Sequence, residues 1–290
     1  MASEGRVAVV AVAASDQVLG FSTVTGKWVA HSAAGLTNGD KVVAAGDVAI
    51  VTVAASNQVL GFSAITGAWT AHSAAGLSNT DQAAAGANVG VVAVSASNQV
   101  LAFRASTGTW TARSAAGLTT SDKVVSAGDV AIVAVAASNQ VLGFSATTGT
   151  WTAQSAAGLS NADQAAAGAS VGVVAVSASN QVLAYRASNG VWVAHSAAGL
   201  TTADKVVSAG DVAIVAVAAS NQVLGFSAVT GTWTAHSAAG MSNTDQAAAR
   251  GNVGVVAVSA SDQVLAYPAG TGVWVVHSAA GLTNLDKIAV

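Results

Sequence analysis

Seven tryptophans recur along the chain at a constant interval of 41 residues, and this repeat limits what the chain can fold into. They are Trp28, Trp69, Trp110, Trp151, Trp192, Trp233 and Trp274. The same step carries an aromatic residue seven positions before each tryptophan, the glutamine of a QVL motif and one aspartate. Seven units of 41 residues account for 287 of the 290 residues. The fold therefore follows from the structure of one unit and from the way in which units stack.

The units are of two kinds that alternate along the chain. Units with the motif QVLGFS alternate with units that read QVLAFR, QVLAYR or QVLAYP, which adds a second period of 82 residues. Because seven is odd, two QVLGFS units must be neighbours, and these are the units that end in Trp28 and Trp69. The pattern indicates that a pair of units was amplified.

Each unit contains three runs that are typical of strands. Residues 47–55 (DVAIVTVAA) form a nearly continuous run of small and β-branched apolar residues, which predicts a strand covered on both faces. Ser56-Asn57 and Thr66-Gly67 are turn signals, and they bound a second strand that begins at Gln58 and a third that begins at Trp69. Residues 81–87 are rich in Ala and Gly, and they could form a short fourth strand or a loop.

Three or four strands in about 41 residues are typical of a propeller blade. A linear solenoid needs atypical capping units, whereas the terminal units of this chain match the inner ones. The C-terminal residues DKIAV also continue in the repeat directly into EGRVAVV near the N-terminus. We therefore predict an all-β, seven-bladed β-propeller that forms a single domain over residues 1–290, closed by pairing of the N- and C-terminal segments in one blade.

The aromatic residue seven positions before each tryptophan, as in FSAITGAW from Phe62 to Trp69, resembles half of the kelch-repeat signature. The resemblance recurs in all seven units, although the double glycine of kelch units is absent. It implies four-stranded blades around a central channel and a binding role at loop surfaces.

Composition and charge exclude several classes of protein. Only 8% of residues are charged and 52% are hydrophobic, which excludes disorder. The net charge of −3 argues against nucleic acid as a partner, and the absence of Cys excludes disulfides and zinc-thiolate sites. The apolar runs are far shorter than the roughly 18 residues that span a membrane. No signal peptide is recognisable in MASEGR, so we expect a cytoplasmic or non-classically secreted monomer without a cofactor.

One polar position of the repeat is a candidate ligand site. The residue three positions after each tryptophan can donate a hydrogen bond in every unit. This position holds His31, His72, Arg113, Gln154, His195, His236 and His277. Because strand side chains alternate, it points away from the tryptophan of its own strand. It could belong to a solvated strand face, or it could be a repeated contact for a hydroxyl-rich ligand; metal binding is disfavoured because one imidazole per blade cannot share an ion.

The tryptophans and the aspartates have structural explanations as well as functional ones. Large aromatic wedges between adjacent sheets explain the tryptophans, which could alternatively stack on sugar rings. Turn capping explains the seven aspartates, which could alternatively form a carboxylate ring at one mouth of the channel. They are Asp40, Asp81, Asp122, Asp163, Asp204, Asp245 and Asp286. A second acidic series, Asp47, Asp129 and Asp211, varies between units, which suggests exposure.

The sequence argues against catalysis. His31, Ser32 and Asp40 have the residue types of a hydrolase triad, but neighbouring strand residues face opposite sides, so His31 cannot reach Ser32. Seven equivalent surfaces also do not supply the singular site that catalysis needs. We expect a non-catalytic, multivalent binding protein that recognises glycans or a protein partner at repeated blade sites. The alternative is a symmetric structural or interaction scaffold, natural or engineered, without a small-molecule ligand.

Overall fold

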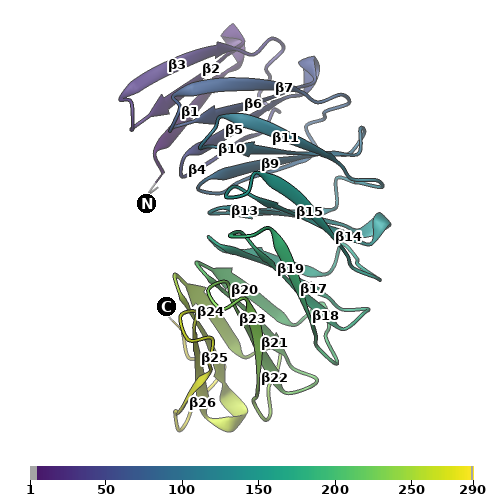
Figure 1. Cartoon of the computed structure of the whole chain (residues 1–290), viewed down its shortest axis with the longest axis vertical. Coiled ribbons are helices and arrows are strands. Elements are labelled where there is room, and N and C mark those ends of the chain that lie inside the picture. The colour runs from purple at the N-terminus through teal and green to yellow at the C-terminus, as the bar shows by residue number, and fades with distance from the viewer. Residues whose placement is uncertain (1–4, 289) are drawn as a thin grey trace.

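The structure, a computed structural model, describes residues 5–288 and 290, and in these residues it forms seven antiparallel sheets that follow one another around an arc (Figure 1). The first sheet has three strands and each of the other six has four, paired in the order of the chain. This confirms the all-β, seven-bladed fold. We number the sheets as blades 1 to 7 in chain order.

The strands are described by their position in the blade, beginning at the concave side of the arc. The innermost strands are β4 (Val42–Ala45), β8 (Gln82–Ala85), β12 (Lys123–Ala127), β16 (Gln164–Ala167), β20 (Lys205–Ala209) and β24 (Gln246–Arg250). The second strands are β1 (Val7–Val12), β5 (Val48–Val53), β9 (Val89–Val94), β13 (Val130–Val135), β17 (Val171–Val176), β21 (Val212–Val217) and β25 (Val253–Val258).

The third strands are β2 (Gln17–Ser22), β6 (Gln58–Ser63), β10 (Gln99–Arg104), β14 (Gln140–Ser145), β18 (Gln181–Arg186), β22 (Gln222–Ser227) and β26 (Gln263–Pro268). The outermost strands are β3 (Lys27–Ser32), β7 (Ala68–Ser73), β11 (Thr109–Ser114), β15 (Thr150–Ser155), β19 (Val191–Ser196), β23 (Thr232–Ser237) and β27 (Val275–Ser278). Short 3₁₀ turns follow four of the second strands: η1 (Ala13–Ser15), η2 (Ala54–Ser56), η3 (Ala136–Ser138) and η4 (Ser259–Ser261).

Local sequence explains these elements. Every residue of β5 is buried, as expected for a strand with a neighbouring sheet on each face. The turn after it places Asn57 in the left-handed region at φ 52°, which Asn tolerates better than most residues, and Gly67 has φ 65° in the next turn. The Ala- and Gly-rich stretch that could have been a strand or a loop forms β8, the innermost strand of blade 3.

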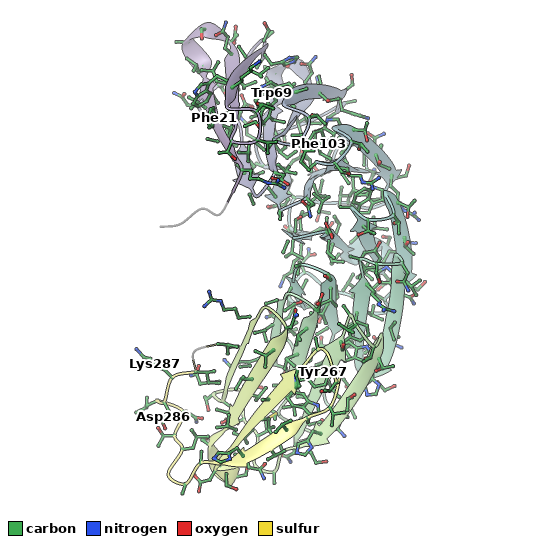
Figure 2. The ribbon with its side chains drawn as sticks, turned by 60° about the vertical axis from the view of Figure 1, so that its left-hand side comes forward. Phe21, Trp69, Phe103, Tyr267, Asp286 and Lys287 are labelled. Carbon is green, nitrogen blue, oxygen red and sulfur yellow. The ribbon has the colours of Figure 1, made fainter. Side chains whose placement is uncertain are left out.

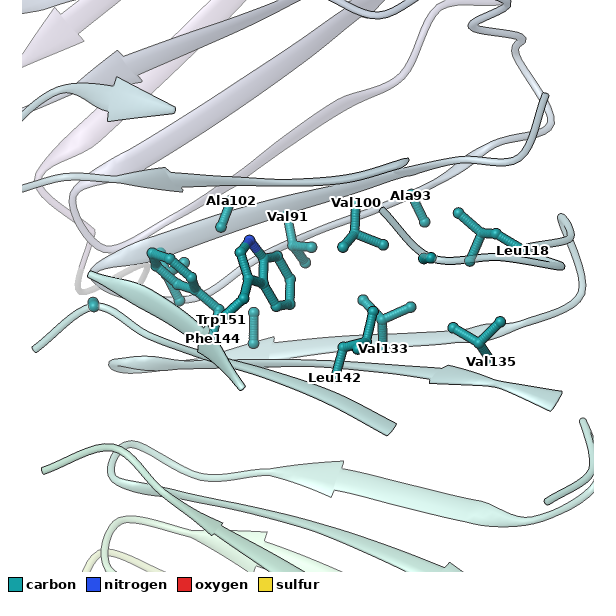
Figure 3. Packing of buried hydrophobic residues seen from close by; sticks show 14 residues of the cluster. Val91, Ala93, Val100, Ala102, Leu118, Val133, Val135, Leu142, Phe144 and Trp151 are labelled. Carbon is teal, nitrogen blue, oxygen red and sulfur yellow. The ribbon is translucent and has the colours of Figure 1, made fainter. Parts of the chain in front are cut away.

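Apolar side chains fill the spaces between neighbouring blades rather than one central core. Six clusters of buried residues are present in the described part of the chain, and each joins two consecutive blades. Between blades 3 and 4, Phe144 and Trp151 of one sheet lie over Val91 and Ala102 of the other (Figure 3). The stability of each blade therefore depends on its neighbours, as in repeat proteins generally.

Close approach between blades explains the alternation of units. A Cβ atom on Gly61 of blade 2 would lie 2.4 Å from the ring of Phe103 in blade 3, and one on Gly90 of blade 3 would lie 2.6 Å from Ile50 of blade 2. The next interface has Ala102 against Phe144 instead. The 82-residue period thus reflects two kinds of interface that alternate along the arc.

The predicted closure by the terminal segments falls largely outside the described residues, because residues 1–4 and 289 are not described. In the described residues the first sheet has three strands and does not pair with the C-terminal segment. Blades 1 and 7 lie at opposite ends of the arc, with an opening between them (Figure 1).

The glycine contacts yield a stability prediction. Gly143→Ala places a Cβ 2.5 Å from the buried ring of Tyr185 in the next blade, so we expect a loss of about 1–3 kcal/mol and a lower melting temperature. Gly270→Ala is the matched control, because a Cβ at Gly270 meets no atom within 4 Å and its φ is not positive. Thermal and urea unfolding, followed by circular dichroism, measure both variants. Equal melting temperatures for the two variants would contradict the proposed packing.

Candidate functional site

The seven polar candidates lie on the outermost strands, facing the next blade. Six are half-buried, and His277 of blade 7 is exposed. The ring of His31 stacks on Trp69 of blade 2 with centroids 6.4 Å apart, and His195 stacks on Trp233 with centroids 6.1 Å apart. A freely solvated strand face is therefore wrong for these six positions, because the following blade covers part of each side chain.

The members of the series differ in their contacts. His72 and His236 have centroids 6.2 Å and 6.5 Å from Trp110 and Trp274 of the following blades. Arg113 Nη1 donates to the backbone carbonyl of Trp151, 3.1 Å away. Gln154 Nε2 donates to the carbonyl of Ser155 in its own blade, at 3.4 Å. Each position thus meets the next tryptophan or the nearby backbone, in a groove between two outermost strands.

The tryptophans are interblade wedges, which confirms their structural explanation. The indole Nε1 of Trp69 donates to the carbonyl of Val29 in blade 1 at 2.9 Å, and Trp192 donates likewise to Thr152 at 3.2 Å. Each ring also packs on the aromatic residue opposite it in the sheet, as Trp69 packs on Phe62 with centroids 5.1 Å apart. Figure 2 shows Trp69 among the first blades.

These contacts leave three indoles partly open to solvent. Trp69, Trp110 and Trp233 are half-buried, whereas Trp151, Trp192 and Trp274 are 9% exposed. Because the indole N–H groups already bond to backbone, a ligand in the groove would meet only the edge or face of the ring. The polar partner in the groove is the His, Arg or Gln of the preceding blade, which can still exchange hydrogen bonds with a ligand.

The aspartate series caps turns, as the structural explanation predicted. Asp81 is 1% exposed; its Oδ2 accepts from the backbone N–H of Ser78 at 2.8 Å, and its Oδ1 accepts from Ser95 N–H at 2.9 Å. Asp122 makes the equivalent bonds to Thr119 and Ala136. The alternative of a carboxylate ring open to the channel is wrong, because these oxygens are buried and bonded.

The second acidic series joins neighbouring blades, and the expectation of general exposure is wrong. Asp47 is 3% exposed and forms an ion pair with Arg6 of blade 1. The half-buried Asp129 accepts from Asn88 Nδ2 of blade 3 at 2.6 Å. The variation between units therefore reflects a change of partner on the neighbouring blade.

The three residue types of a hydrolase triad are not brought together. His31 stacks on Trp69, whereas Asp40 accepts hydrogen bonds from the backbone of Thr37 and Ala54. Within the described residues, no group of three or more His, Cys, Asp or Glu side chains is placed to hold a metal ion. The same residues include no helix long and apolar enough to cross a bilayer.

Sequence reasoning missed one interblade position, the last residue of each third strand. Ser63 Oγ donates to the carbonyl of Ala105 in blade 3 at 2.6 Å, and Ser145 Oγ makes the same bond to Ala187. In blade 5 Arg186 replaces the serine, and its Nε donates to Ala228 at 2.5 Å. The signal in the sequence was the strict alternation of Ser and Arg here, which changes the donor but keeps the acceptor.

Comparison with known proteins gives structural similarity only. No protein-family model matches the sequence, and no curated protein matches it. Among solved structures, the chain is similar to the computationally designed Ika8 protein at 13% identity and a TM-score of 0.37, covering 96% of this chain and 86% of that one. It is also similar to BamB from Moraxella catarrhalis (18%, TM-score 0.34, 95% and 82% covered) and to AztD from Citrobacter koseri (10%, TM-score 0.41, 97% and 86% covered). The blade architecture is assigned from the chain's own sheets, and the kelch resemblance stays a prediction.

The capping role of the aspartates predicts the effect of their removal. Asp122→Ala leaves the N–H groups of Thr119 and Ala136 without their partner, and we expect a loss of about 1–3 kcal/mol. Asp286→Ala is the matched control, because Asp286 is exposed and bonds only within its own turn, to Thr283. Melting temperatures measure both variants. An increase in the wild-type melting temperature with Ca²⁺ or Mg²⁺ would instead favour a carboxylate cation site.

A buried tyrosine predicts a loss of stability at high pH. Burial raises the pKa of Tyr185 from 10.0 to about 12. The unfolded chain therefore loses this proton first, and the free energy of unfolding falls as the pH rises from about 10 to about 12. Tyr185→Phe is expected to reduce that fall, because Phe103 and Phe144 occupy the same position in other blades. Urea unfolding at a series of pH values measures the effect, and identical pH dependence of the two proteins would refute it.

Proposed function

We propose that this protein is a non-catalytic, multivalent binding protein that recognises glycans in the grooves between its outermost strands. The observation that carries the proposal is the recurrence of one arrangement at six blade junctions. In each, a half-buried polar side chain of one blade lies beside the tryptophan of the next.

The chemistry of the groove suits hydroxyl-rich ligands. A neutral imidazole offers one donor and one acceptor, and Arg or Gln offers donors in the same place, so that sugar hydroxyls can be bonded in every groove. The partly open rings of Trp69, Trp110 and Trp233 offer aromatic surface to the apolar face of a sugar. Individual grooves would bind weakly, and a branched or clustered glycan that spans several grooves would gain avidity.

A scaffold without a small-molecule ligand is the second candidate, and a specific observation favours it. The indole N–H groups, the capping aspartates and the serines at the strand ends already bond within the fold. Such a molecule would present a stable, repetitive rim to a protein partner.

A glycan array of the folded, labelled protein tests the proposal, with heat-denatured protein as the control for nonspecific adhesion. We expect saturable binding to a related set of glycans. His72→Ala combined with His236→Ala should weaken that binding by about tenfold, because two grooves lose their polar side chain. Ser73→Ala combined with Ser237→Ala is the matched control, because these exposed serines are the next residues on the same strands.

Tryptophan fluorescence gives an independent measurement. If glycans enter the grooves, the emission spectrum should change on titration with a ligand found on the array. A blank array together with emission that does not respond to sugars would reject glycan recognition and favour the scaffold.

A further inference from the structure

The two ends of the arc carry the two halves of an interface that already exists inside the molecule. Between blades 3 and 4, one half consists of Val91, Ala93, Val100, Ala102 and Leu118. The other half consists of Val133, Val135, Leu142, Phe144 and Trp151. Figure 3 shows these ten residues facing one another across the junction.

The same residues recur, type for type, on the terminal blades. Blade 7 carries Val255, Ala257, Val264, Ala266 and Leu282, which we name the C-end face. Blade 1 carries Val10, Val12, Leu19, Phe21 and Trp28, which we name the N-end face. The alternation of units is also kept, because blade 7 and blade 3 are of one kind, and blade 1 and blade 4 are of the other.

Both end faces are uncovered. Trp28 is 54% exposed, whereas its counterpart Trp151 is 9% exposed, and Val10 is 45% exposed against 0% for Val133. On blade 7, a hollow of about 250 Å³ is lined by Val255, Ala257, Val264 and Leu282. In the internal junction, the equivalent surface is covered by Val133, Val135 and Leu142 of the following blade.

Polar partners are unmatched in the same complementary way. Trp151 Nε1 donates to the carbonyl of Thr111, and the equivalent pair across the two ends would be Trp28 and Val275. The side chain of Val275 is 58% exposed on blade 7. Leu285, which is 90% exposed, stands at the position where Thr244 of blade 6 contacts Asn284 of blade 7.

We propose that the C-end face of one molecule binds the N-end face of a second copy, with the contacts that join blades 3 and 4. Within one chain the two faces lie at opposite ends of the arc (Figures 1 and 2). The six internal junctions repeat one set of contacts, such as the indole bonds of 2.9–3.2 Å, and meeting of the two ends within one chain would have to change all of them. The interface is heterologous, so one copy leaves a free face at each end for further copies. This differs from the monomer expected from sequence.

The test uses one variant for each end face. Val275→Asp places a charge on the C-end side, and Trp28→Ser removes the wedge of the N-end face; both residues are exposed, so the blades should still fold. Val229→Asp is the matched control, because Val229 is 53% exposed at a turn of blade 6, away from both end faces. Circular dichroism confirms folding of each variant.

Light scattering after size exclusion, over a range of concentrations, measures the mass. We expect the wild type and Val229→Asp to exceed the mass of one chain as concentration rises, and each end-face variant alone to associate about tenfold more weakly or worse. A mixture of Val275→Asp and Trp28→Ser should form a dimer and nothing larger, because together they hold one intact pair of faces.

Two results would overturn the proposal. One is a wild type that remains at the mass of one chain at every concentration, which would mean that the end faces meet within the molecule or stay free. The other is association that both end-face variants keep. Glycan binding by the grooves is measured separately, so a failure of self-association leaves the proposed function standing.

Discussion

The packing of one aromatic pair between neighbouring sheets is the contact on which the rest of the structure depends. In each internal blade a Phe or Tyr and a Trp lie side by side on one face, and they press on the previous blade where that blade has Gly or Ala. Large side chains opposite small ones bring the two backbones close and bury most of the apolar surface. Because each of the six clusters spans two blades, the molecule is held together by its junctions rather than by one shared core.

The polar positions of the repeat follow from the same geometry. Side chains on the face toward the next blade meet its turns and its tryptophan, so they are drawn into bonds across the junction, as Ser63 is with Ala105. The buried aspartates satisfy the turns that connect consecutive strands. Few repeated polar groups remain free for a ligand, and the half-buried series on the outermost strands is the one that still reaches solvent.

The alternation of units is also a property of junctions. Glycine on one blade accommodates an isoleucine or an aromatic ring from the next, and the following junction uses alanine in its place. Two substitutions at one junction must therefore change together, which explains why pairs of units resemble each other more closely than neighbours do. The odd number of units forces one junction between blades of the same kind, where Gly20 meets Phe62.

Sequence alone determined the number of blades, the second, third and outermost strands, and the turns between them, because these depend on local apolar runs and on residues such as Asn57 and Gly67 that suit particular backbone angles. It also indicated that the tryptophans are wedges and that the aspartates are caps. It left the innermost strand open, since QAAA has a weak preference for either outcome. Tertiary structure decided that His31 lies against Trp69, that Asp47 is buried beside Arg6 and that Trp28 is uncovered, because the partner of each stands in another blade or is missing at the end of the arc. A residue type and its spacing specify which way a side chain points from its strand, but the surface that it meets exists only after the sheets have packed.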